Sequence, residues 1–168
     1  KNPRFSFYPP GRVCAAFIHD SSAAASKWVY SHEYGRHILE NFPDGQVRTL
    51  SYENVRTDGE VDQAVEDAVR RGANVIFTTT PKLLLSSVRQ AALHPDVKIL
   101  NCSLNTSYPS VRTYYPRLYG AKFIKGAIAG TLTRDGCIGY VADYPTYGSI
   151  ASINAFAQGA RMVNANAR

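Results

Sequence analysis

Short apolar runs alternate with longer amphipathic stretches along most of this chain. The runs at residues 12–18, 74–77 and 97–104 are almost continuously apolar, which is typical of strands covered on both faces of a parallel sheet. Residues 46–52 alternate in polarity and predict a weaker strand. Residues 137–142 predict another strand near the end of the chain. The pattern therefore predicts five strands.

The stretches between these runs carry apolar residues at the spacing of a helix. Trp28 and His32, for example, share one face of a 3.6-residue period. Thr57 and Glu60 predict a capping box, and the small residues of 126–130 permit close helix packing. Helices are predicted at residues 26–41, 57–71, 81–92, 114–133 and 148–163. This alternation predicts an α/β fold with a doubly wound, mostly parallel sheet.

The charge balance changes this picture little. The 168 residues carry a net charge of +6, which permits weak attraction to nucleic acid or acidic membranes. The basic residues are scattered, as at Arg70–Arg71 and at Lys122 and Lys125, so no nucleic-acid partner is expected. No run reaches the roughly 18 apolar residues of a membrane span. Residues 1–10 lack the apolar segment of a signal peptide.

Motifs for catalysis or cofactor binding are missing from the sequence. It contains no GxSxG, HExxH or P-loop motif. His19 and Asp20 are adjacent, and neighbouring strand residues point to opposite faces, so they do not predict a dyad. Cys14, Cys102 and Cys137 lie in apolar runs without a CxxC spacing, which favours structural thiols over disulfides. We therefore expect no enzyme, no metal and no cofactor.

Candidate ligand contacts gather where the predicted strands end. In doubly wound sheets, ligands bind outside the carboxyl ends of the strands. The residues there combine hydroxyls, an amide, a carboxylate and aromatic rings, which suit a flat, polar, uncharged molecule. The ligand-binding candidates are Asp20, Trp28, Thr79, Thr80, Asn101, Ser103 and Tyr144.

Most of these candidates also have a purely structural interpretation. Thr80 is a suitable cap for a helix that starts at the following proline. Trp28 begins the apolar stripe of its helix and fits a place in the core. Asp20 suits a loop cap, and Asn101 suits a bridge to loop backbone. The histidine at position 32 favours a packing role over a ligand role.

Several segments, in order along the chain, carry a family resemblance. Residues 28–36 resemble the W-x-Y-x-H-x-x-G-R stretch of the basic membrane protein (nucleoside-binding) family, related to PnrA. Residues 72–79 and 92–98 resemble its third strand and its A-x-H-P-x-V-K turn. Residues 126–142 and 153–160 are similar to its crossover and to the helix that follows.

The resemblance implies a type I periplasmic-binding-protein fold, in which two α/β lobes close on a ligand. Residues 1–11 would be an N-terminal extension, 12–133 the first lobe, and 134–168 the start of a truncated second lobe. Family members are ABC transporter substrate-binding proteins, often surface lipoproteins, and bind purine nucleosides. The implied partners are a purine nucleoside or related molecule and the transporter permease, in an extracytoplasmic, membrane-anchored protein. Since family members are longer, the chain is expected to be a fragment.

Two positions depart from the family pattern. Ala25 stands where the family usually has an Asp that holds the base, and Gly120 stands where Glu is common. The first departure weakens the implied purine specificity. Two other hypotheses stay open: a ligand-sensing regulatory domain of this fold in a larger cytoplasmic protein, and a small flavodoxin-like enzyme. The second would need turnover that depends on His19 or Asp20.

Overall fold

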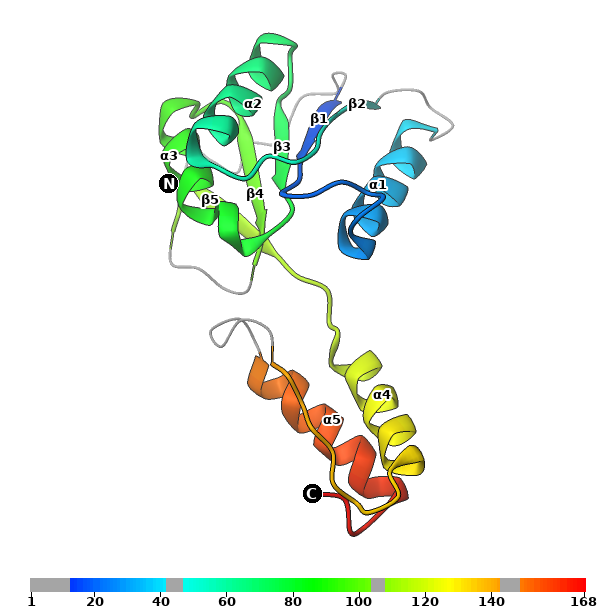
Figure 1. The fold of residues 1–168 in the computed structure, drawn as a ribbon. Coiled ribbons are helices and arrows are strands. Elements are labelled where there is room, and N and C mark those ends of the chain that lie inside the picture. Colours follow the sequence, from blue (N-terminus) through cyan, green and yellow to red (C-terminus); the bar gives the residue numbers. More distant parts are fainter. Residues whose placement is uncertain (1–12, 42–46, 104–107, 143–148) are drawn as a thin grey trace. The chain divides into compact units, whose positions relative to one another are not determined.

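The chain forms two compact units, one ending at Tyr114 and the other beginning at Tyr115. The structure, a computed structural model, describes residues 13–41, 47–103, 108–142 and 149–168. Figure 1 shows the five strands in the first unit and two long helices in the second. Within the described ranges, no helix has both the length and the apolar character needed to cross a membrane.

A five-stranded parallel sheet is the centre of the first unit. Its order is β2-β1-β3-β4-β5, so β1 and β3 are inner neighbours although β2 lies between them in sequence. The register places Ile18 beside Thr78 and Thr78 beside Asn101. The strands are β1 Val13–Ile18, β2 Val47–Tyr52, β3 Val75–Thr78, β4 Lys98–Cys102 and β5 Val111–Tyr114. The predicted parallel sheet is confirmed.

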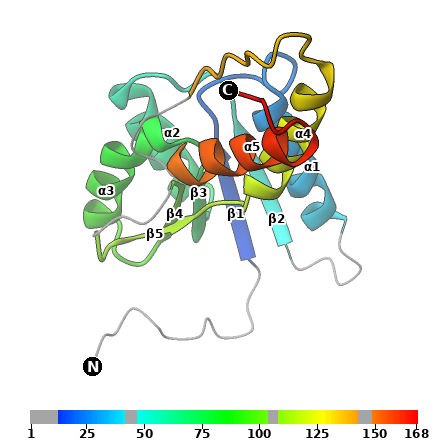
Figure 2. The same ribbon diagram turned by 90° about the horizontal axis from the view of Figure 1, so that it is seen from below.

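Helices cover both faces of this sheet. They are α1 Lys27–Glu40, α2 Asp58–Arg70, the short 3-10 helix η2 Pro81–Leu83, and α3 Leu84–Leu93. Figures 1 and 2 show α2 and α3 on one face and α1 on the other. The doubly wound α/β prediction is therefore confirmed.

The apolar core lies between the sheet and the α2–α3 face. Ile18 and Ile76 on the strands, and Val61 and Val65 on α2, are completely buried there. Helix α2 begins with the predicted capping box, in which Thr57 accepts from the Glu60 amide and the Glu60 side chain returns to the cap backbone. The capping box thus sets where α2 begins, and the 3.6-residue period of its apolar residues gives the helix one apolar face, which packs on the sheet.

The fifth strand was predicted in the wrong place. Residues 137–142 form no strand, and the sheet instead gains β5, which lies in a stretch predicted as a loop and a helix start. The backbone N–H and C=O groups of a strand need hydrogen-bond partners on a neighbouring strand, and those of β5 pair with β4. The helix predicted from residue 114 begins only at Tyr119, because Pro116 disfavours helical geometry in the residue before it.

The second unit consists mainly of α4 Tyr119–Leu132 packed on α5 Ser149–Val163. A Cβ added at Gly126 would overlap the Phe156 carbonyl, and one at Gly159 would overlap the Phe123 carbonyl. The two helices therefore touch through backbone, as the small residues of 126–130 predicted. The larger apolar side chains of α4 lie away from this contact and are exposed: Ile124, Ile128 and Leu132.

The contact between α4 and α5 puts the division between the units well before residue 133. Helix α4 belongs with α5 and not with the sheet, although the sequence assigned it to the first lobe. The lobe boundaries concern a longer two-lobed protein and stay a prediction. The predicted extension at residues 1–11 lies outside the described residues.

Candidate functional site

The carboxyl ends of β1, β3 and β4 bring polar side chains together at one edge of the sheet. The parallel register places the chain just after Ile18 beside that after Thr78, which in turn lies beside Asn101. His19, Thr79, Thr80 and Ser103 all follow these strand ends, as the sequence predicted.

Asn101 ties two strand ends together and is completely buried. Its amide nitrogen donates to the Thr78 hydroxyl at 2.8 Å and to the Thr80 carbonyl oxygen at 2.9 Å. The Thr78 hydroxyl also lies 2.8 Å from that of Ser87 on α3. Asn101 thus has the bridging role that its structural interpretation anticipated. Within the described part of the chain, its Oδ1 and the buried Ser103 hydroxyl have no hydrogen-bond partner.

Thr80 is the cap of the short helix η2. Its backbone is extended, and its hydroxyl accepts from the Lys82 amide at 3.4 Å, with Pro81 at the first helical position. Thr80 is nearly buried. Thr80 therefore caps the helix, and its contact with a ligand stays a prediction.

Thr79 and His19 form a buried pair directly behind this edge. The imidazole Nδ1 of His19 lies 2.9 Å from the Thr79 hydroxyl, and Nε2 lies 2.9 Å from Oε1 of Glu33 on α1. The Thr79 hydroxyl also lies 3.2 Å from the Ile18 carbonyl oxygen. Both His19 and Thr79 are completely buried. His19 therefore joins the ends of β1 and β3 to helix α1.

Glu33 is the centre of the hydrogen bonds that hold α1 on the sheet. It accepts from the Ser51 hydroxyl on β2 and from Nε of Arg36, each at 2.8 Å. Burial raises the pKa of the Glu33 carboxyl, but the bonds from Ser51, Arg36 and His19 outweigh it and leave this pKa below its usual value. Burial lowers the pKa of His19 despite the nearby Glu33. The pair is therefore a neutral imidazole beside a carboxylate near neutral pH.

Trp28 lies in the first turn of α1 at the same edge and is half-buried. Its indole N–H donates to the Thr79 carbonyl oxygen at 2.7 Å. The His32 ring stands edge-on to it, with ring centroids 5.1 Å apart, and His32 Nδ1 lies 2.9 Å from the Trp28 carbonyl oxygen. Trp28 is thus fixed to the loop after β3 and is not part of the apolar core.

Asp20 lies at the partly exposed rim of the edge. Its carboxylate accepts from Nζ of Lys82 at 3.2 Å, and its carbonyl oxygen accepts from Nε of Arg56 at 3.4 Å. Lys82 was not anticipated from the sequence, and neither were Glu33 and Arg36. The last two do lie within the family-like 28–36 segment, which was a usable signal. Asp20 therefore brings the loops after β1, β2 and β3 together.

An aromatic group covers the sheet beside α1. Phe17 stacks on Phe77 with centroids 4.8 Å apart, and Tyr114 stands edge-on to Phe77 and His32. Burial raises the pKa of the Tyr114 hydroxyl, and it raises that of the Cys102 thiol to about 11. A thiol with that pKa is a poor nucleophile at neutral pH.

The three cysteines divide into two kinds. Cys14 and Cys102 are buried, as the apolar runs predicted, whereas Cys137 is exposed because its predicted strand does not form. In the part of the chain that the structure describes, no group of three metal-ligating side chains is close enough to hold an ion. The candidate Tyr144 lies outside the described residues.

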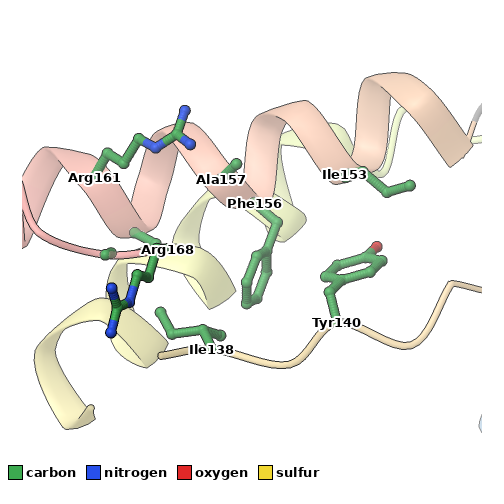
Figure 3. Close-up of a pocket in the computed structure, with 9 residues that line it drawn as sticks. Ile138, Tyr140, Ile153, Phe156, Ala157, Arg161 and Arg168 are labelled. Atoms are coloured by element: carbon green, nitrogen blue, oxygen red, sulfur yellow. The ribbon is translucent and has the colours of Figure 1, made fainter. Parts of the chain in front are cut away.

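A separate small pocket belongs wholly to the second unit. Figure 3 shows Tyr140 and Phe156 facing one another in it, with Ile138 and Ile153 beside them and Arg168 near one end. The two rings lie 4.9 Å apart. Its volume of about 120 Å³ is well below the roughly 300–1,000 Å³ of small-molecule sites. Its size therefore argues against this pocket as a small-molecule site.

The chain is similar in sequence to two named relatives and similar in fold to a solved structure. The chain is 28% identical over 157 residues to a purine-binding protein of Brucella abortus, covering 94% of this chain and 45% of that protein. It is 26% identical over 155 residues to a putative ABC transporter glucose-binding protein of Haloferax volcanii, covering 92% and 39%. The chain thus spans less than half the length of these relatives.

The fold is shared with a solved ABC transporter solute-binding protein of Conexibacter woesei. The TM-score is 0.65 at 16% identity, covering 93% of this chain and 52% of that one. Residues 12–168 also match the family described as ABC transporter substrate-binding protein, PnrA-like. The match covers nearly the whole chain, in agreement with the resemblance in its sequence. The chain belongs to the PnrA-like family of ABC transporter substrate-binding proteins.

Proposed function

We propose that the strand-end edge of the first unit is one wall of a cleft that binds a purine nucleoside or a related molecule. A second lobe, beginning near residue 134, closes over the ligand, and a transporter permease receives it from the closed protein. The protein acts outside the cytoplasm, anchored to the membrane as a surface lipoprotein. It binds and releases without chemical turnover.

The observation that carries this proposal is the state of Trp28. The indole N–H donates to the Thr79 carbonyl oxygen, which fixes the ring at this edge and leaves no indole donor for a ligand. The residue is half-buried at the edge where ligands bind in doubly wound sheets. Stacking of a base on such a ring contributes roughly 1–3 kcal/mol. Trp28 therefore suits a planar, uncharged ring system.

Buried polar groups at the carboxyl end of β4 support a ligand with hydrogen-bonding groups. Both amide hydrogens of Asn101 are donated within the protein, whereas its acceptor Oδ1 receives no hydrogen bond from the described residues. A buried group without a partner costs roughly 1–3 kcal/mol, which a ligand hydroxyl or amino group would offset. Ser103, Thr79, Thr80, Asp20 and Tyr144 complete the proposed set. We expect the loop ends to adjust on binding, since Asn101 and Ser103 are covered here.

A short backbone pairing in the second unit supports the start of a second lobe. The Ile138 amide donates to the Arg168 carbonyl oxygen at 2.9 Å, and the Arg168 amide donates to the Gly136 carbonyl oxygen at 2.8 Å. Two bonds that reach from one residue to both neighbours of the facing residue are the pattern of a parallel ladder. These two bonds join segments on either side of α5, although neither segment forms a strand in the described residues.

The test is ligand binding by the protein at the full length that its gene encodes. Thermal unfolding is followed with purine nucleosides, pyrimidine nucleosides, free bases and glucose. A ligand at about 100 times its dissociation constant adds about 2.7 kcal/mol to the free energy of unfolding, an easily seen shift. We expect a purine nucleoside to give it.

Variants connect that shift to the proposed wall. Trp28→Ala is expected to weaken binding by roughly 1–3 kcal/mol, with Trp28→Phe between it and the native protein. Tyr34→Ala, at an exposed aromatic on the same helix, is the matched control and should bind normally. A shift with glucose alone would overturn the nucleoside assignment. No shift with any compound would overturn the cleft and favour the regulatory-domain hypothesis.

A further inference from the structure

His19 has two partners on different elements and no direct part in the proposed ligand contacts. It is completely buried, with Nδ1 2.9 Å from the Thr79 hydroxyl and Nε2 2.9 Å from Glu33. Thr79 in turn accepts the Trp28 indole N–H through its carbonyl oxygen. A continuous chain of hydrogen bonds therefore runs from Glu33 through His19 and Thr79 to the ring proposed to hold the ligand.

We propose that His19 is a positioning residue, which fixes the loop after β3 through Thr79 and thereby fixes the place of Trp28. The inference concerns Trp28 in the unliganded protein. The effect of His19 on ligand binding rests on the proposed function, but its effect on the position of Trp28 can be tested without a ligand.

The directions of the hydrogen bonds follow from the partners. The Glu33 carboxylate only accepts, so His19 Nε2 carries a hydrogen and donates to it. In the neutral ring Nδ1 is then an acceptor, and the Thr79 hydroxyl must donate to it. When the ring gains a proton, Nδ1 becomes a donor, and the Thr79 hydrogen turns to the Ile18 carbonyl oxygen, 3.2 Å away. The protonation state of His19 thus decides where the Thr79 hydroxyl points.

The charged and titratable groups around His19 come from two elements. Helix α1 contributes Glu33 at Nε2, Arg36 behind that carboxylate, and His32, whose ring centroid lies 6.2 Å from that of His19. The loop after β2 contributes Glu53, whose charge acts at longer range. The groups from β1 and β3 that contact the imidazole are uncharged. Any pH effect on the Thr79 loop must therefore be measured in a protein without the His32 imidazole, which touches Trp28 directly.

Trp28 is the only tryptophan among the 168 residues. Replacing any tryptophan that the full-length protein has outside these residues by phenylalanine makes intrinsic fluorescence report on Trp28 alone. We would compare the emission of the native protein with that of His19→Gln and His19→Asn. Gln places its amide near Nε2 and keeps the Glu33 bond, whereas Asn places its amide near Nδ1 and keeps the Thr79 bond. His94→Gln is the control, because it makes the same replacement at another His–Glu pair, with Nε2 3.1 Å from Glu66, away from Trp28.

We expect Trp28 emission to move to longer wavelength in His19→Gln, to move less in His19→Asn, and to stay unchanged in His94→Gln. Nucleoside binding should weaken roughly threefold to tenfold in His19→Gln, as for the loss of one hydrogen bond. Unchanged emission in a folded His19→Gln protein would overturn the inference.

A pH titration decides the question if His19→Gln does not fold. In a His32→Asn background, Trp28 emission should still change reversibly in acid while the circular dichroism stays native, and adding His19→Asn should abolish this change. A titration that is the same with and without His19 would overturn the inference. A native protein that shows these emission changes but binds no ligand would leave the positioning role standing and would reject only the proposed function.

Discussion

The two faces of the sheet in the first unit are held by different kinds of interaction. Helix α2 buries Val61, Ala64, Val65 and Ala68, which are all apolar. Helix α1 buries only Val29 and the carboxylate of Glu33. Apolar burial is strong but non-directional, whereas hydrogen bonds fix angles and distances. The difference suggests that the α2–α3 face supplies most of the stability, and that the α1 face sets the position of the ligand-side residues.

The largest expected effect is on the apolar face. Ile76→Ala removes a completely buried side chain of β3 and should lower the free energy of unfolding by about 3–4 kcal/mol, through lost burial and a residual cavity. Urea unfolding measures this change. Ile124→Ala on α4, where the side chain is 61% exposed, is the matched control and should stay within about 0.5 kcal/mol. Equal effects would contradict the assignment of the core.

The next effect is on the polar face. Glu33→Gln keeps the shape of the side chain but removes the charge that Arg36 and His19 meet, and should cost about 2 kcal/mol in the same unfolding experiment. Glu66→Gln, in an exposed pair with His94, should cost less than about 1 kcal/mol. If the two variants were equal, the α1 face would not depend on its buried network.

The pH dependence of stability distinguishes the faces further. Because burial lowers the pKa of His19 in the folded protein, the unfolded chain binds a proton more readily. The contribution of His19 is therefore full above the usual value of 6.5 and is lost as pH falls through the lower folded value. Glu33 also has a lowered pKa, and its contribution is lost below 4.5.

Chemical unfolding at a series of pH values from 8 down to the acid limit measures this loss. For His19 alone, the slope is at most about 1.4 kcal/mol per pH unit. His19→Gln should flatten the part of the curve just below 6.5 and leave the Glu33 part unchanged. Ile76→Ala should lower the whole curve without changing its shape. A curve for His19→Gln that keeps the native slope would disprove the assignment.

The smallest effects are at the helix caps of the two faces. Thr57→Ala removes the hydroxyl of the α2 capping box and should cost about 1 kcal/mol, because the Glu60 amide loses its acceptor. Ser26→Ala removes the single cap bond of α1, to the Val29 amide, and should cost about 0.5 kcal/mol. Thermal unfolding monitored by circular dichroism resolves both. A larger loss of stability for Ser26→Ala than for Thr57→Ala would show that α1 depends on its N-terminal cap more than on the hydrogen bonds of Glu33.

The α2 side of the molecule was predictable and the α1 side only partly so. Val61, Val65 and Ala68 recur at the spacing of one helix face, so the sequence alone predicts that this face packs on an apolar surface. The role of Glu33 depends on His19 and Ser51, which are 14 and 18 residues away in sequence. No local sequence pattern predicts these contacts, because they depend on which strands are neighbours in the sheet. For the same reason the sequence offered two interpretations of Asn101, and only the neighbouring strand β3 shows its bonds to the Thr78 hydroxyl and the Thr80 carbonyl oxygen.

The sequence by itself determined the fold class, the four strands from β1 to β4, the capped start of α2 and the family, because each of these leaves a local signature. It also located the edge where Trp28, Thr79 and Asn101 meet, since parallel strands end on one side. Only the tertiary structure decided which segment fills the fifth strand position. It alone decided that α4 packs on α5 through glycines, and that His19 joins Glu33 to Thr79. These outcomes depend on which partner a segment finds, and a hydrogen bond or close helix contact needs both partners in place.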